Sequence, residues 1–192
     1  MDEQLNPREQ HVLLEIARSA IGQYLAEGEL HIVPREERRL NLKRGCFVSL
    51  KLKNQLRGCI GNFQSEQPLY KNVAEMALAA ATKDPRFYPL GAQELGQCRL
   101  EISVLSALEK ISNIDQIEIG RHGIYLEKDF YRGVLLPQVA TEHGWDRHCF
   151  LDQTCIKAGL PTSAWRDEDT DIYIFSAQVF GEGLPTEADS VA

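Results

Sequence analysis

The sequence predicts an α+β fold with a mainly antiparallel sheet flanked by helices. Helical and strand-like segments are mixed without the regular strand–helix–strand order of parallel sheets. Two pairs of predicted strands are joined by turns that are too short for a parallel crossover, one near residue 53 and one near residue 128. A chain of 192 residues suffices for one compact unit divided into two unequal subdomains.

The first predicted element is an amphipathic helix over residues 7–27. Its apolar residues recur at helical spacing, with Asn6 as the N-cap and Pro7 at the first helical position. Gly28 ends this helix, because glycine adopts the left-handed conformation of helix C-caps at little cost. The charged stretch 34–43 shows neither period, so we interpret it as a solvated connection or a short helix.

A β-hairpin is predicted next. Residues 46–52 alternate between apolar and polar side chains, and a second strand covers 55–60. Lys53 and Asn54 form the short turn between them. The hairpin places Cys59 on its second strand.

A helix over residues 69–83 and a strand over 98–104 follow the hairpin. The helix ends before Pro85, since the residue before a proline avoids the helical region. The strand has the clearest alternation in the chain, with Cys98 on its apolar side and Glu101 on its polar side.

The C-terminal part completes the predicted fold. Pro137 begins a helix that Gly144 ends, and Asp146 caps a second helix that Gly159 ends. In order we predict a turn at 121–123, strands at 124–127 and 131–136, helices at 137–143 and 147–158, and a late strand at 172–180. We expect residues 1–7 and 181–192 to be flexible ends.

Composition narrows the classes of function. Apolar residues make up 43% of the chain and charged residues 26%, which is typical of a soluble globular protein. The net charge of −7 argues against a nucleic-acid partner, because such binding depends on clustered lysine and arginine. The sequence has no export signal and no apolar stretch of membrane-spanning length, so we expect a cytoplasmic protein without a membrane partner.

The five cysteines are expected to be reduced thiols. They are odd in number and have no Cys-x-x-Cys spacing, which argues against disulfides and a zinc site. Cys46, Cys98 and Cys155 lie on apolar faces and are expected in the core, whereas Cys149 is ambiguous. Familiar cofactor motifs are absent as well, and we expect neither a metal nor a cofactor.

Cys59 is the strongest candidate for chemistry. In an extended strand Arg57 and Cys59 project from one face, so the guanidinium is expected to reach over the thiol and favour its thiolate. Gly58 and Gly61 remove side-chain bulk on either side, so that another backbone or a small ligand could approach. The alternative is a small buried cysteine with a packing role.

Other polar residues are weaker candidates. Glu101 and His143 are candidates for handling protons, although a histidine in the last turn of a helix often only stabilises the helix dipole. An Arg57–Glu101 ion pair is the structural alternative for Glu101. Candidates for ligand binding are Arg86, His122 and Gln138.

Several motifs occur together in one order. They lie at 56–61, 84–87, 102–106, 121–123, 135–140, 144–146 and 154–161. Together they resemble the AMMECR family, whose microbial members are called AmmeMemoRadiSam system protein A. The resemblance covers residues 8–180 and implies a single domain of two intertwined subdomains, with the arginine–cysteine motif as its hallmark. It also implies that genes of this family occur together with genes for a Memo-like protein and a radical SAM protein.

Two hypotheses for function stay open at this point. The first is an enzyme or enzyme component in which Cys59 is the reactive thiol, Arg57 stabilises the thiolate or an anionic substrate, and Glu101 or His143 moves protons. The second is a binding or accessory module that docks the Memo-like and radical SAM partners or an unknown small molecule without chemistry. RNA binding is a distant third.

Overall fold

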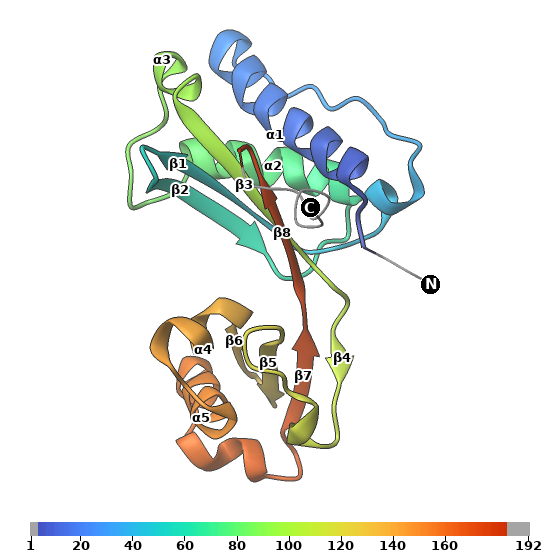
Figure 1. The fold of residues 1–192 in the computed structure, drawn as a ribbon, viewed down its shortest axis with the longest axis vertical. Helices are drawn as coiled ribbons and strands as arrows, with labels where there is room; N and C mark the ends of the chain where they lie inside the picture. Colours follow the sequence, from blue (N-terminus) through green and yellow to red (C-terminus); the bar gives the residue numbers. More distant parts are fainter. Residues whose placement is uncertain (1–3, 184–192) are drawn as a thin grey trace, which may run out of the picture. The chain divides into compact units, whose positions relative to one another are not determined.

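The computed structural model describes residues 4–183, and the chain divides into two units. The first unit comprises the residues up to Leu105 and those from Gln178 onward, and the second comprises Ser106–Ala177. The first unit is therefore discontinuous in sequence. Each unit contains helices packed on a four-stranded, mainly antiparallel sheet, so the predicted α+β class is confirmed (Figure 1).

The first unit contains the predicted long helices and the hairpin. Its elements are α1 (Pro7–Glu27), a 3₁₀ helix (Arg38–Asn41), β1 (Cys46–Leu52), β2 (Gln55–Asn62), α2 (Leu69–Thr82), α3 (Ala92–Leu95), β3 (Cys98–Leu105) and β8 (Ala177–Gly181). The strand order is β2-β1-β3-β8, which places β2 at one edge of the sheet. The four-residue helix α3 was not predicted, because it is too short to show a periodic pattern.

The ends of α1 follow from local sequence, as predicted. The Asn6 side chain accepts the Glu9 N–H at 2.9 Å, and the Glu9 carboxylate accepts the Asn6 N–H at the same distance. Gly28 closes the helix with φ at 76°, in the left-handed region that glycine adopts readily. These interactions satisfy backbone groups that a helix end otherwise leaves without partners.

The two faces of the first sheet differ in character. The inner face is apolar at its centre, where Val48, Leu50 and Ile102 are fully buried, and it packs against α1 and α2. Figure 1 shows these two helices beside β1 and β3. The opposite face, here called the outer face, consists of Phe47, Ser49, Lys51, Leu56, Cys59, Gly61, Arg99, Glu101 and Ser103. Most of its side chains are half-buried.

The β1–β2 hairpin contains an irregularity that positions the candidate site. Lys53 and Asn54 have φ of 51° and 64°, the conformation of a tight two-residue hairpin turn. The pairing then shifts by one residue between Leu50 and Lys51, so that Leu50 pairs with Gly58 while Lys51 pairs with Leu56. This β-bulge leaves one residue of β2 without a partner on β1.

The second unit has its own core. Its elements are β4 (Glu109–Lys110), a 3₁₀ helix (Ile114–Gln116), β5 (Gly123–Lys128), β6 (Tyr131–Leu135), α4 (Pro137–His143), α5 (Arg147–Ala158), a 3₁₀ helix (Thr162–Arg166) and β7 (Asp171–Phe175). The sheet order is β4-β7-β5-β6. Ile124, Leu126 and Ile172 are buried with Phe150 and Leu151 of α5. The predicted caps at Asp146 and Gly144 are present.

The expected single strand over 172–180 is wrong. It consists of β7 and β8, which belong to different sheets and different units. The break falls at Ser176, whose N–H donates to the Ser106 hydroxyl at 3.0 Å while its carbonyl accepts the Ser106 N–H at 2.9 Å. Pairing with Ser106 thus replaces the sheet hydrogen bonds at the point where the chain leaves one sheet for the other.

Residues near both ends of the described chain make defined contacts. The Leu5 N–H donates to Gln178 Oε1 at 2.8 Å, and the Glu182 carboxylate accepts two hydrogen bonds from Arg18. The remaining parts of the expected flexible ends, 1–3 and 184–192, lie outside the described residues. Within residues 4–183, no helix combines the length and the apolar character needed to cross a membrane.

Candidate functional site

Cys59 lies on the outer face of the first sheet, opposite Ser49. The bulge sets this register, and the Ser49 hydroxyl donates to the Cys59 sulfur with an Oγ–Sγ distance of 3.1 Å. Cys59 is half-buried, whereas Cys46, Cys98 and Cys155 are buried as predicted. Burial raises the pKa of the Cys46 thiol to about 12 and also raises the pKa values of Cys98 and Cys155. Cys59 therefore differs from these three core thiols in its exposure to solvent.

Glu101 lies in the same row as Cys59 and Ser49. Ser49 pairs with Cys59 on β2 and with Glu101 on β3, so the three residues follow one another across three strands of the outer face. The Lys51 ammonium donates to the Glu101 carboxylate at 2.7 Å. We call the set Cys59, Ser49, Glu101 and Lys51 the outer-face row.

The expected position of Arg57 over Cys59 is wrong. Arg57 is the residue at the bulge, which breaks the two-residue alternation that would place it on the face of Cys59. Its Nε and Nη2 atoms instead donate to the two carboxylate oxygens of Glu94, each at 3.1 Å. This pairing lowers the pKa of Glu94. The expected Arg57–Glu101 ion pair is likewise replaced by Arg57–Glu94 and Lys51–Glu101.

Asp84 and Arg86 close the edge of β2 at Cys59. The Cys59 N–H donates to Asp84 Oδ2 at 2.8 Å, and Arg86 Nη2 donates to the Cys59 carbonyl at 3.3 Å. Arg86 also donates to both oxygens of the buried Asp84 carboxylate, which holds the pKa of Asp84 well below its usual range and raises that of Arg86. The loop after α2 therefore occupies the position of a neighbouring strand.

At the two glycines near Cys59, protein atoms occupy the space that a side chain would take. A Cβ at Gly58 would lie 2.2 Å from the Ala80 carbonyl oxygen, so the close approach is that of the α2 backbone. A Cβ at Gly61 would lie 2.3 Å from the Phe47 ring. Both glycines thus allow neighbouring protein atoms to pack closely against β2. That either one also admits a ligand stays a prediction.

Three predicted site residues belong to the second unit. The His143 ring is exposed and stacks on Trp145, with 4.6 Å between ring centroids. His122 Nδ1 lies 3.2 Å from the Glu118 nitrogen, which holds the turn before β5. Gln138 is exposed in the first turn of α4. Roles for these residues in proton transfer or ligand binding stay predictions.

The structure adds residues that the sequence analysis missed. Ser49 and Asp84 contact Cys59 directly, and Lys51 and Glu94 pair with two of the predicted residues. Counting back from the two-residue turn would pair Ser49 with Gly58, one position away from Cys59. No sequence signal therefore points to Ser49. Asp84 stands out in the sequence only as the residue before Pro85 and as a member of the 84–87 motif, and neither feature predicts its contact with Cys59.

The outer-face row combines a thiol with a hydroxyl, a carboxylate and an ammonium group. The Ser49 hydroxyl donates to the Cys59 sulfur, and the Glu101 carboxylate lies two strands from Cys59 on the same face. The exposed Arg86 guanidinium and the Lys51 ammonium supply positive charge. Among the residues that the structure describes, no three His, Cys, Asp or Glu side chains gather to hold a metal ion.

Comparison with known proteins agrees with the architecture. The family model described as AMMECR1 matches residues 14–180. Protein MK0488 of Methanopyrus kandleri is 42% identical over 194 residues, covering 96% of this chain and 94% of that protein. Protein NEQ441 of Nanoarchaeum equitans is 42% identical over 178 residues, covering 88% and 98%. The crystal structure of the uncharacterized protein PH0010 from Pyrococcus horikoshii matches with a TM-score of 0.77 and 41% identity, covering 91% of each chain.

Proposed function

Because the chain belongs to the AMMECR1 family, we propose that the outer-face row is the reactive centre of a thiol-dependent enzyme or enzyme component. The observation that carries this proposal is the 3.1 Å contact between the Ser49 hydroxyl and the Cys59 sulfur. A thiol with only a packing role needs no such donor. Here the sulfur is half-buried, on the face of the sheet opposite α1 and α2.

Each member of the row has a role in this proposal. Cys59 acts as the nucleophile in its thiolate form, and the Ser49 O–H stabilises the negative sulfur. Glu101, held in position by Lys51, lies two strands from Cys59 and takes up the thiol proton by way of solvent rather than by direct contact. Arg86 directs the Cys59 backbone and presents its exposed guanidinium to an anionic small-molecule substrate. Arg57 contributes by holding Glu94 beside the edge of the sheet.

The test is the alkylation rate of Cys59 in the intact chain. Iodoacetamide labelling is followed by peptide mass spectrometry from pH 5 to pH 10, with half-buried Cys149 as the internal reference. We expect Ser49→Ala to slow labelling of Cys59 near pH 7 about fivefold, the equivalent of one lost hydrogen bond. Ser103→Ala is the matched control, since Ser103 lies on the same face opposite Phe47. Equal rates for Cys59 in wild type and Ser49→Ala would refute the proposed centre.

A second candidate is a non-catalytic binding module. It is favoured by the sheet of the first unit, where α1 and α2 pack on the inner face while outer-face side chains stay half-exposed. The partners would be the Memo-like and radical SAM proteins that the family resemblance implies. Copurification with these proteins from a cytoplasmic extract, unchanged in Cys59→Ser together with unchanged cellular function, would favour binding over chemistry. Loss of cellular function with partner binding intact would favour chemistry.

A further inference from the structure

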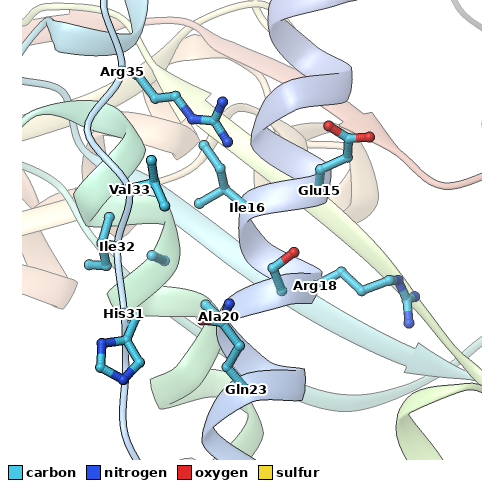
Figure 2. Close-up of a pocket in the computed structure, with 11 residues that line it drawn as sticks. Glu15, Ile16, Arg18, Ala20, Gln23, His31, Ile32, Val33 and Arg35 are labelled. Atoms are coloured by element: carbon cyan, nitrogen blue, oxygen red, sulfur yellow. The ribbon is translucent and has the colours of Figure 1, made fainter.

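A cavity of about 360 Å³ lies in the first unit on the helix side of the sheet. It is bounded by α1, by the segment 31–35 and by Ala74 of α2. Figure 2 shows this segment running beside α1, with the cavity residues distributed along both. Cavities of this volume hold small organic molecules.

Two polar atoms in the cavity wall are buried without a hydrogen-bond partner. They are Oε1 of Gln23 and Nε of Arg35, and they are the buried side-chain nitrogen and oxygen atoms within residues 4–183 that have no partner. Figure 2 shows the Arg35 guanidinium directed from the segment toward α1, and the Gln23 side chain folded back along α1 toward Ala20. A buried polar atom without a partner is costly, so a ligand that supplies a partner to each of these atoms would be bound favourably.

The other charged residues of the cavity wall already have partners. Arg18 donates to Glu182 and to the carbonyl oxygens of Leu95 and Cys98. Glu15 pairs with His11 at 3.3 Å, and His31 pairs with Glu29 at 3.3 Å. Among the charged residues that line this cavity in the described part of the chain, Arg35 is therefore the one whose cationic side chain has no partner.

The wall between the two unsatisfied atoms is apolar. Ile16 and Ala20 of α1 face this space together with Ile32, Val33 and Ala74. A guanidinium N–H requires an acceptor, best a carboxylate, and an amide oxygen requires a donor. In Figure 2 the Arg35 guanidinium and the Gln23 side chain lie apart from each other along α1, so a ligand that reaches both is elongated.

We propose that this cavity binds a small linear carboxylic acid with a hydroxyl or amine at its far end. The carboxylate accepts from Arg35, the aliphatic body contacts Ile16 and Val33, and the terminal donor bonds Gln23 Oε1. This site is separate from the outer-face row, because it lies on the helix side of the sheet and uses none of the residues of that row. The proposal therefore does not depend on the chemistry of Cys59.

The test is an NMR titration of the full chain with 6-hydroxyhexanoate. We expect saturable amide shifts confined to residues 15–23 and 31–35 and to the neighbourhood of Ala74. Arg35→Gln should weaken binding about tenfold or more, whereas Arg8→Gln removes the same charge from an exposed position of α1 and should change it less than about twofold. Gln23→Leu should weaken binding of 6-hydroxyhexanoate but leave hexanoate unaffected.

Two further probes test the two polar contacts of the ligand on the wild-type chain. 1,6-Hexanediol lacks the carboxylate and should bind about tenfold more weakly, and hexanoate lacks the terminal donor and should bind about threefold more weakly. Absence of saturable shifts at these amides up to about 20 mM probe would overturn the proposal. Equal affinity for 6-hydroxyhexanoate and 1,6-hexanediol would also overturn it, as would equal affinity of wild type and Arg35→Gln.

Discussion

The carboxylate of Asp84 accepts the backbone N–H of Cys59 at 2.8 Å, across 25 positions of sequence. This bond and the Arg86 contact to the Cys59 carbonyl replace the strand that an edge position of a sheet lacks. The candidate thiol is thus held by its own backbone and not only by its side chain. The Asp-Pro-Arg motif that follows α2 therefore also contacts the backbone of Cys59.

Asp84→Asn should lower the free energy of unfolding by about 2 kcal/mol at pH 6, because it removes a buried charge-assisted hydrogen-bond network. The pKa of Asp84 is lowered in the folded state, so its contribution is present above the ordinary value near 4 and is lost as the pH falls below it. The difference between wild type and variant should therefore shrink from pH 6 to pH 3.

Urea unfolding followed by far-UV circular dichroism measures this difference. Tryptophan fluorescence is unsuitable because Trp145 and Trp165 both lie in the second unit. Glu66→Gln is the control, since Glu66 forms an exposed ion pair with Lys43 in the same unit and its loss should leave the midpoint unchanged. A stability difference for Asp84→Asn that stays constant across this pH range contradicts the prediction.

Gly58→Ala should destabilise the chain by about 1–3 kcal/mol, because the new methyl group would collide with the backbone carbonyl of Ala80. Gly96→Ala provides the comparison. Gly96 has φ of −64° and nothing within 4 Å of an added Cβ, so this change should be neutral or stabilise by up to about 1 kcal/mol. Thermal unfolding measures the melting temperatures of the two variants. Similar melting temperatures would contradict the prediction and would mean that the α2 backbone at Ala80 moves to make room for the methyl group.

Arg57 and Glu94 should be coupled by about 1 kcal/mol in a double-mutant cycle. Their two parallel hydrogen bonds and the low exposure of Arg57, 15% for its side chain, favour a stronger pair than most surface ion pairs. The cycle compares Arg57→Ala, Glu94→Ala and the double variant by urea unfolding. Additive effects would contradict this. A large loss of Cys59 labelling in Arg57→Ala alone would instead restore the direct role expected from the sequence.

Native cysteine labelling should modify Cys59 and Cys149 and spare the three core thiols. Burial raises the pKa of Cys46 to about 12, and Cys98 and Cys155 are also buried with raised pKa values. Iodoacetamide at pH 8 followed by mass spectrometry checks this, with a denatured sample as the reference for complete labelling. Early labelling of Cys46 would mean that the first unit opens locally.

The sequence by itself determined the elements whose ends obey local rules. The capping box at Asn6, the glycines after α1, α4 and α5, and the tight turn at Lys53 and Asn54 each act within a few residues. Alternation likewise identified β1 and β3 and their buried cysteines. Such short-range interactions can be predicted from one sequence, because both partners lie within a few residues of each other.

Only the tertiary structure decided the partners of Cys59. The bulge shifts β2 by one position, which brings Ser49 rather than Val48 opposite Cys59 and turns Arg57 toward Glu94. The division of 171–181 between two sheets depends on Ser106, 70 residues away. A strand's register and a long side chain's partner are set by packing against distant segments, and period-two alternation carries no information about either.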